Sequence, residues 1–419
     1  MPPRIKPHRV AEIMLASLGL EVVSCTELQS LWAGYGHICA VTAQAADAEA
    51  AAKFAQVCGE LEGAKSNKFH LILKLISPPS SNDTAGDEGH LRKMMSYDIE
   101  QYFYNEITPQ LEEDVAVAKC LTSTRHLEGH ADAKELQGLT ATIMTDLRRK
   151  FPIAGEKRSL LEPSQVHAAL DWLAKFHSSS WKMLPDDLSD FVLPPLEEMK
   201  RRQSDPDISQ QKLWLNGGYT YLATRQKEYD SLAGDSYSEW SEAFCAPSEG
   251  SLPSIANMVA DFLTPCDRPF ETYIHGDVKS ENLFTTEMND EVAFFDFQYV
   301  GLGLGVCDLA KLFTCSVPMN MLTDKNTIPN KLSMKRGEKT LLKHYRKTLL
   351  SRRPPGREID YPMNIFVRHW ETALVDWCRF QASWGFWGNT EWLEARVRSI
   401  LADQGWRDWL QEEVSNLPR

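Results

Sequence analysis

The amino-acid sequence predicts an α+β fold, with a small N-terminal part built on an antiparallel sheet and a larger, mainly helical C-terminal part. Short β-prone runs lie within the first 146 residues, and two of them are joined by a glycine-containing turn, as in a hairpin. Apolar residues at helical spacing, many of them tryptophan, fill the last third. A chain of 419 residues is long enough for two such parts, each with its own core.

The composition is that of an ordinary globular protein, with 43% hydrophobic and 25% charged residues. A net charge of −13 argues against a nucleic-acid partner. The nine cysteines are scattered and form no C-x-x-C pair, which argues against structural zinc and against a disulfide framework. We therefore expect a reducing, cytoplasmic setting. The sequence does not indicate an oligomeric state.

The N-terminal segment predicts the first helix. No apolar run in the chain approaches the roughly 18 residues of a membrane span. Basic residues at 4–9 precede a helical pattern over 10–18, and Glu12 interrupts any signal-peptide core. An organelle transit peptide stays an open alternative.

Residues 27–42 follow as strand, glycine turn and strand. Gly34 and Gly36 would let backbone N–H groups approach phosphates closely. Cys39 stands where the last glycine of a nucleotide-binding loop is expected, and a plain hairpin turn explains the segment almost as well.

A lysine and a glutamate come next in the order that nucleotide binding requires. Lys74 lies in the β-prone run 69–77, although alternation alone also allows a solvent-facing lysine at this position. Glu100 lies beside the apolar stripe of a predicted helix over 90–106. An ion pair between them would aim the ammonium at nucleotide phosphates. A third β-prone run covers 139–147, and a core-packing helix covers 164–177.

The most informative segment joins His275-Gly276-Asp277, Asn282 and Asp296-Phe297-Gln298, each half framed by apolar runs. Two short strands would present an acid, an amide and a second acid at one loop cluster. Phosphoryl transfer from a magnesium nucleotide needs one carboxylate to orient the acceptor hydroxyl, and an amide oxygen plus a carboxylate to hold the metal. The alternative is that these residues are only turn formers and caps.

The H-G-D-x-x-x-x-N and Asp-Phe-Gln motifs resemble the aminoglycoside phosphotransferase and choline kinase superfamily, and within it the ecdysteroid kinase-like branch. The resemblance extends from about Leu31 to Asn389. It implies a two-lobed protein-kinase-like fold, with an N-terminal lobe over 1–146, a C-terminal lobe over 147–419 and a hinge near Asp146.

The resemblance also implies cofactors and roles. ATP and Mg²⁺ are the expected cofactors. Asp277 corresponds to the catalytic base, Asn282 and Asp296 to the metal ligands, and His275 to a structural residue. The nucleotide would be bound by the glycine turn, by the ion pair and by the strand and hinge near adenine, that is, by Gly34, Gly36, Lys74, Glu100, Met144 and Asp146.

Two later segments have structural explanations. The run Gly301-Leu-Gly-Leu-Gly305 predicts a flexible turn opening a helix capped by Asp308, because no Lys-Ser/Thr follows to complete a phosphate loop. In the family, the matching aspartate supports the catalytic loop. Near the C-terminus we expect Trp370 and Trp377 in the core, whereas the glycine-flanked Trp384 and Trp387 either line a substrate pocket or pack in the core.

We therefore predict ATP-dependent phosphorylation of a hydroxyl on a small molecule that is choline-, aminoglycoside- or sterol-like, hence cationic or amphipathic. About a dozen residues separate Asp296 from Asp308, which leaves little room for the regulatory segment of protein kinases. A nucleotide-binding pseudokinase or scaffold is the main alternative, and an atypical protein kinase is a weaker one.

Overall fold

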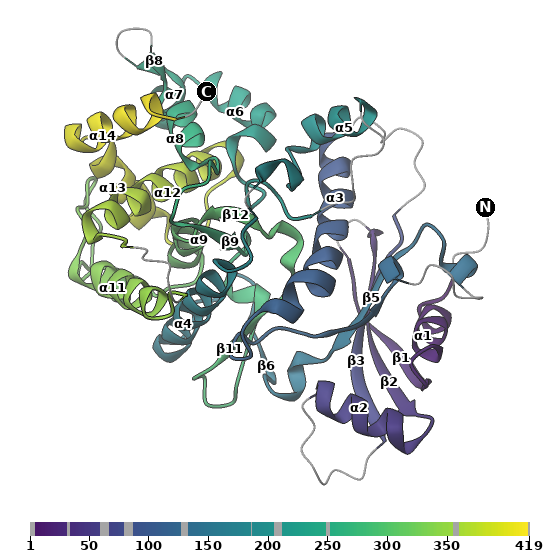
Figure 1. Cartoon of the computed structure of the whole chain (residues 1–419). Coiled ribbons are helices and arrows are strands. Elements are labelled where there is room, and N and C mark those ends of the chain that lie inside the picture. The colour runs from purple at the N-terminus through teal and green to yellow at the C-terminus, as the bar shows by residue number, and fades with distance from the viewer. Residues whose placement is uncertain are drawn as a thin grey trace. The chain divides into compact units, whose positions relative to one another are not determined.

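The computed structural model (Figure 1) describes residues 5–31, 34–58, 67–78, 87–126, 133–185, 187–204, 212–248, 252–354 and 360–417. The chain forms two compact units, and each is described by itself. The N-terminal unit comprises residues 1–110 and 117–150, and the C-terminal unit comprises 111–116 and 151–419. The boundary at residue 146, as the site of a functional hinge, stays a prediction.

The N-terminal unit contains a five-stranded antiparallel sheet in the order β1-β2-β3-β5-β4. Its strands are β1 (Leu20–Ser30), β2 (Gly36–Ala45), β3 (Lys68–Ile76), β4 (Cys120–Ser123) and β5 (Thr140–Thr145). Its helices are α1 (Pro7–Ala16), α2 (Ala48–Cys58) and α3 (Glu88–Tyr102), the last continuing into a π-helical turn at Phe103–Ile107. The predicted first helix and the three predicted β segments are all present.

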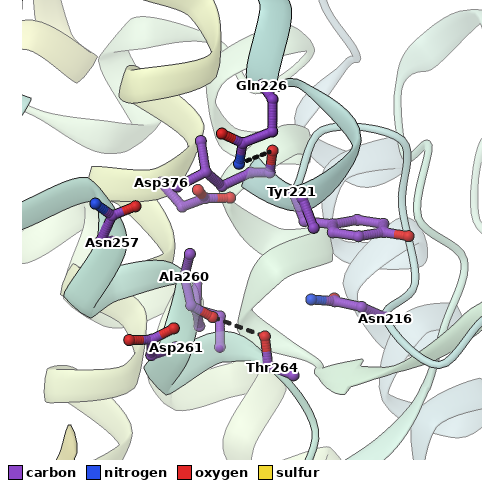
Figure 2. Close-up of a pocket in the computed structure, with 11 residues that line it drawn as sticks. Asn216, Tyr221, Gln226, Asn257, Ala260, Asp261, Thr264 and Asp376 are labelled. Carbon is purple, nitrogen blue, oxygen red and sulfur yellow. Dashed lines mark hydrogen bonds between the residues drawn. The ribbon is translucent and has the colours of Figure 1, made fainter. Parts of the chain in front are cut away.

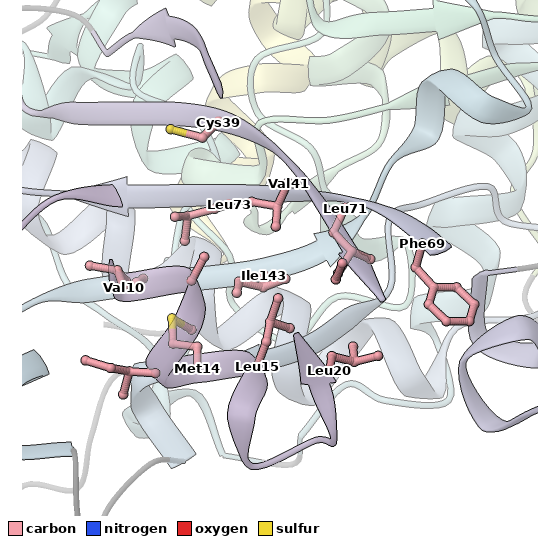
Figure 3. Close-up of a cluster of buried hydrophobic side chains, with 14 of the residues drawn as sticks. Val10, Met14, Leu15, Leu20, Cys39, Val41, Phe69, Leu71, Leu73 and Ile143 are labelled. Atoms are coloured by element: carbon pink, nitrogen blue, oxygen red, sulfur yellow. The ribbon is translucent and has the colours of Figure 1, made fainter. Parts of the chain in front are cut away.

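The alternation of β3 explains how this sheet serves two purposes. Phe69, Leu71 and Leu73 point to one face, where they pack with side chains of α1 and β5 in a continuous apolar core (Figure 3). Lys74 points to the opposite face, as the sequence indicated, and meets α3. Each fully buried leucine contributes about 1.5–3 kcal/mol, so this core fixes the register that presents Lys74.

The C-terminal unit is mainly helical. Its helices are α4 (Pro163–Ser180), α5 (Pro195–Ser204), α6 (Gln226–Ala233), α7 (Glu239–Cys245), α8 (Ile255–Leu263), α9 (Val306–Cys315), α10 (Met319–Leu322), α11 (Arg336–Ser351), α12 (Met363–Trp384), α13 (Thr390–Leu401) and α14 (Gln404–Ser415). Its short strands are β6 (Ile153–Ala154), β7 (Pro247–Ser248), β8 (Leu252–Ser254), β9 (Glu271–Ile274), β10 (Leu283–Thr285), β11 (Val292–Phe294) and β12 (Gly301–Leu304). A small antiparallel-sheet unit and a larger helical unit confirm the predicted fold class.

Two predictions about the glycine run after Asp296 are corrected. Residues 301–304 form β12, which pairs with β9, and not a flexible turn. A Cβ on Gly301 would lie 2.3 Å from the carbonyl oxygen of Trp214, so a glycine is needed for close packing at this position. Asp308 does not cap α9 either, because the N-cap is Gly305 and the carboxylate of Asp308 is bound to other backbone groups.

Among the described residues, none of the helices combines the length and apolar character needed to cross a lipid bilayer.

Candidate active site

Asp308 holds the backbone of the loop that follows β9. Its carboxylate accepts the N–H groups of His275 (2.7 Å) and Gly276 (2.9 Å), and it also contacts His177 Nε2 at 3.1 Å. Burial disfavours the charged carboxylate, but the hydrogen bond and charge of His177, with nearby Lys311, outweigh burial and lower the pKa of Asp308. Asp308 therefore supports the loop that carries His275–Asp277, as the resemblance implies.

His275 is a fully buried, neutral spacer in this loop. Its Nδ1 accepts the N–H of Asp277 at 3.3 Å, and its Nε2 therefore carries the proton that is donated to the carbonyl of Phe295 at 3.0 Å. Burial lowers the pKa of His275, which favours this neutral form. The imidazole thus links the backbone carbonyl of Phe295, the residue before Asp296, to the backbone N–H of Asp277.

The backbone at Gly276, the second residue of the H-G-D motif, requires a glycine. Its φ is +83°, and a Cβ would lie 2.3 Å from the carbonyl oxygen of Tyr299. Lys311 Nζ donates to its carbonyl at 2.7 Å.

The Asp277 carboxylate is oriented by two donors. Asn282 Nδ2 donates to Asp277 Oδ2 at 2.9 Å, and Lys279 Nζ lies 3.1 Å from the same oxygen. Burial opposes the charge on Lys279, but Asp277 and Glu281 outweigh burial and raise its pKa. Lys279 therefore stays protonated and leaves Oδ1 of Asp277 as the oxygen for a further partner.

Asp296 is held near Asn282 by the β10–β11 hairpin. Leu283 pairs with Phe294, and the N–H of Phe295 donates to the carbonyl of Asn282 at 3.0 Å. Asp296 itself has φ 67° and ψ 61°, a left-handed conformation that is uncommon outside glycine, and Gln298 Nε2 donates to its Oδ1 at 2.6 Å. Strained backbone of this kind clusters at functional sites.

The donor set around Asn282 and Asp296 fits Mg²⁺. Mg²⁺ takes oxygen ligands and is commonly bound by one or two carboxylates together with substrate phosphates. Because the amide nitrogen of Asn282 is turned to Asp277, its Oδ1 is the atom left for a metal. No group of three or more His, Cys, Asp or Glu side chains arranged for a metal occurs in the described parts of the chain, so phosphate oxygens and water would complete the coordination.

In the N-terminal unit, Lys74 and Glu100 form a buried ion pair with 2.5 Å between Nζ and Oε2. Both line a small cavity of about 10 Å³, as does Met144 on the neighbouring strand β5. Burying an ammonium is costly unless it is paired, so the glutamate of α3 fixes the direction of the lysine. The structure thus brings three of the six proposed nucleotide residues together.

The other three lie at the turn and at the end of β5. Gly34 (φ +73°) and Gly36 (φ +156°) flank Tyr35 at the start of β2, and Gly36 is opposite Ile76, two residues beyond Lys74. Asp146 follows β5, and its carboxylate accepts the N–H of Arg148 at 3.0 Å and pairs with its guanidinium at 2.6 Å. This carboxylate is engaged locally, so only the backbone of Asp146 would be offered to adenine.

Aromatic residues of the C-terminal unit lie beside Asp277. The Tyr219 ring packs against Tyr299 (4.8 Å between centroids) and Phe380 (5.8 Å). Burial, and then the negative charge of Asp277, raise the pKa of Tyr219 well above its ordinary value. The phenol therefore keeps its proton near the carboxylate of Asp277.

Arg225 extends this aromatic group towards Trp384. Its guanidinium lies 5.6 Å from the ring centroids of Tyr219 and Phe380 and 5.0 Å from that of Trp384, and it pairs with Glu228 at 3.2 Å. Trp384 is 58% exposed. Trp370 and Trp377 are buried, as predicted for core residues.

A polar cavity of about 170 Å³ is lined in part by residues on either side of Arg225 (Figure 2). An apolar cavity of about 150 Å³ can hold benzene, so the space suffices for a small molecule. Its labelled lining residues come from the segment after Trp214, from α6, α8 and α12, namely Asn216, Tyr221, Gln226, Asn257, Ala260, Asp261, Thr264 and Asp376. Figure 2 shows Asn257 and Asp261 on one helix across from Asp376.

Sequence reasoning missed four residues of this site. Lys279 and Gln298 lie inside the quoted motifs, and their signal was a charged or amide side chain two residues from each key aspartate. Tyr219 and Lys311 carry no local signal, because only folding brings them to the catalytic loop.

Comparisons with known proteins add the family. The model of the ecdysteroid kinase-like family matches residues 53–328, which is more than half of the chain. No curated protein matches at a significant level. Among solved structures, the chain is similar to an ethanolamine kinase of Plasmodium vivax (12% identity, TM-score 0.40, 96% of this chain and 88% of that one).

The chain is also similar to a macrolide 2'-phosphotransferase from Brachybacterium faecium (10%, 0.38, 97% and 97%) and to a choline kinase from Streptococcus pneumoniae (12%, 0.36, 96% and 96%). At these values the structural likenesses carry no conclusion of their own. The family match does, and it agrees with the H-G-D and Asp-Phe-Gln motifs: the chain belongs to the ecdysteroid kinase-like family.

Proposed function

We propose that the protein transfers the γ-phosphate of ATP to a hydroxyl group of a small molecule. The observation that carries this proposal is the arrangement around Asp277, whose carboxylate receives Asn282 and Lys279 on one oxygen while the β10–β11 hairpin holds Asp296 close to Asn282. These are the residue types that phosphoryl transfer needs, since catalysis consists mainly of positioning and charge stabilisation.

Asp277 is the proposed base. With Oδ2 fixed by two donors, Oδ1 would accept a hydrogen bond from the acceptor hydroxyl. It would take the proton as the new oxygen–phosphorus bond forms, while the bond from the γ-phosphorus to the bridging oxygen breaks and ADP leaves. The Lys279 ammonium, 3.1 Å from the same oxygen as Asn282 Nδ2, restricts the rotation of the carboxylate.

Asn282 Oδ1 and the Asp296 carboxylate are the proposed metal ligands. When bound there, Mg²⁺ would neutralise charge on the nucleotide phosphates. Gln298 donates a hydrogen bond to one carboxylate oxygen of Asp296 and so orients the proposed metal ligand.

The N-terminal unit would bind the rest of the nucleotide. Lys74, directed by Glu100, is the proposed phosphate ligand, and the backbone of Gly34 and Gly36 would approach the phosphates. Met144 and Asp146 are the proposed adenine contacts.

The acceptor is best described as amphipathic. Tyr219, which packs on Tyr299 and lies near the charge of Asp277, favours an acceptor with an apolar face. The Arg225 guanidinium already lies within 5.6 Å of the centroids of three rings of this group, which makes a second cation there unfavourable. The family's name refers to ecdysteroids, whose kind of polyhydroxylated apolar skeleton would suit this surface better than an aminoglycoside.

The test is transfer of label from γ-labelled ATP into a panel of small alcohols. The wild-type protein is compared with Asp277→Asn and with a matched control, Asp324→Asn, which changes an exposed aspartate. We expect label in a small compound with the wild type and the control, and at least about a hundredfold less with Asp277→Asn.

The alternatives predict other outcomes. Binding of MgATP without transfer to any alcohol would favour a pseudokinase, and label in added protein would favour a protein kinase. Equal transfer by Asp277→Asn would refute the assignment of the base.

A further inference from the structure

Tyr35 is buried at a place where a side chain usually points into solvent. It lies between Gly34 and Gly36 in the turn before β2, yet only 6% of its surface is exposed. The unusual backbone angles of the two glycines turn the chain so that the ring points inward. The buried side chain of Tyr35 therefore fixes the turn that is proposed to approach the phosphates.

Tyr35 packs against one face of α3. The hydroxyl of Tyr35 lies 2.6 Å from Nδ1 of His90, the ring lies 4.6 Å below the ammonium of Lys93, and its centroid lies 6.3 Å from that of Tyr97. Residues 90, 93 and 97 are spaced at three and four, so they share one helix face. Burial, and then the charge of Asp87, raise the pKa of Tyr35, which keeps the phenol protonated as a donor to His90.

The same face leads directly to the ion pair. Glu100 is one turn beyond Tyr97 on α3, and the Lys74 ammonium lies 5.8 Å from the Tyr97 ring and 2.5 Å from Glu100. The backbone supplies a second tie, because the N–H of Ser77, at the end of β3, donates to the carbonyl of Tyr35 at 2.7 Å. The turn is thus fastened both to the helix that carries Glu100 and to the strand that carries Lys74.

We propose that Tyr35 is a positioning residue for nucleotide binding, whose hydrogen bond to His90 holds the glycine turn and the Lys74–Glu100 pair in one arrangement. This inference rests on the proposed function. Without the hydrogen bond to His90, the glycine turn would no longer be held at a fixed distance from the Lys74 ammonium. Binding of the nucleotide phosphates would then have to order the turn, which would weaken the affinity.

The test measures MgATP affinity by titration, which needs no knowledge of the acceptor. Tyr35→Phe removes only the hydroxyl and keeps the ring between Lys93 and Tyr97. The matched control is Tyr102→Phe, which removes a hydroxyl from a residue of α3 whose ring contacts Arg125. We expect about three- to tenfold weaker MgATP binding for Tyr35→Phe, the worth of one hydrogen bond, and no change for the control.

A double-mutant cycle separates positioning from general damage. His90→Leu should weaken binding to the same degree, and Tyr35→Phe combined with His90→Leu should be no weaker than either alone, because both remove one bond. Additive losses, or affinities equal to wild type in the single variants, would overturn the proposal. A wild-type protein that binds no MgATP would instead overturn the proposed function on which it rests.

Discussion

The left-handed conformation of Asp296 allows the metal site to be tested without disturbing the backbone. Asparagine tolerates φ near +67° at least as well as aspartate, whereas alanine does not. We expect Asp296→Asn and Asp296→Ala both to lose phosphate transfer, but only the alanine variant to lose about 1 kcal/mol of unfolding free energy. Transfer assays and urea unfolding check both parts. Unchanged turnover in the asparagine variant would remove Asp296 from the proposed metal site.

His369 predicts how stability depends on pH. It is buried, and its Nδ1 lies 2.6 Å from the hydroxyl of Tyr361. Burial, and then the charge of Arg268, lower the pKa of His369 to about 3. In the unfolded chain the pKa is about 6.5. Between these values the unfolded state binds a proton that the folded state does not, so stability is full above about pH 6.5 and falls on acidification.

Replacing His369 by glutamine should remove this part of the acid sensitivity. Between about pH 7 and pH 5.5 we expect the wild type to lose about 1 kcal/mol more unfolding free energy than His369→Gln. Urea unfolding at the two pH values measures this difference, and parallel losses in the two proteins would contradict it.

Residue by residue, the predicted site depended on motifs and on alternation. The face of β3 that carries Lys74 follows from a pattern of period two, and the structure agrees with it. Tyr219 and Lys311 could not be found in this way, because they reach the catalytic loop from 58 residues before Asp277 and 34 residues after it. The roles of the site residues stay predictions until variants are measured.

The buried carboxylate of Glu338 links three helices of the C-terminal unit. Glu338 of α11 accepts a hydrogen bond from Trp370 of α12 at 2.8 Å and pairs with Arg396 of α13 at 3.0 Å. Burial raises the pKa of Glu338, although Arg396 opposes the rise. Because both groups are withdrawn from water, each depends on the other.

Glu338→Gln should therefore destabilise the protein, by about 3 kcal/mol, because it leaves the buried guanidinium of Arg396 with only the more distant Glu371, at 3.9 Å, as a counter-charge. Changing both partners, as Glu338→Leu with Arg396→Met, should recover most of the loss. The exposed pair of Arg9 and Glu135 is the control, and Glu135→Gln should leave the unfolding midpoint unchanged. A Glu338→Gln variant as stable as wild type would contradict this account.

Elements were harder to predict where they were short. The long helices and the main strands carry clear periodicity, whereas β12 is only four residues of alternating glycine and leucine and pairs with β9 through contacts that local sequence does not encode. Tertiary pairing overrode the weak strand propensity of glycine at this place.

For the whole molecule, the proposal predicts coupling between ligand and stability. A ligand that binds only the folded state stabilises it by about 2.7 kcal/mol at a hundred times its Kd. We expect saturating MgATP to raise the melting temperature of the wild type and of Asp277→Asn, and to raise that of Asp296→Asn less. Differential scanning calorimetry measures the shift. An equal shift with ATP and excess chelator would argue against a metal-dependent nucleotide site.

The fold class followed from composition, periodicity and the motifs together, since a small sheet unit and a helical unit were predicted and are present. The path of the chain between them could not be predicted. Residues 111–116 interrupt the N-terminal unit but belong to the C-terminal one. A stretch of six residues without regular structure has no sequence pattern that would show to which unit it belongs.

That short stretch limits how the gene can be divided. The carbonyl of Ala116 accepts the indole N–H of the buried Trp172 at 2.8 Å, and Asp114 pairs with Arg352 at 2.8 Å. A truncated gene beginning at codon 151 would encode the catalytic loop but omit these partners, leaving the indole of α4 unsatisfied. Expression of the C-terminal part alone, or recombination of halves between relatives, would therefore have to carry codons 111–116 along, as a grafted segment or on a second, co-expressed fragment.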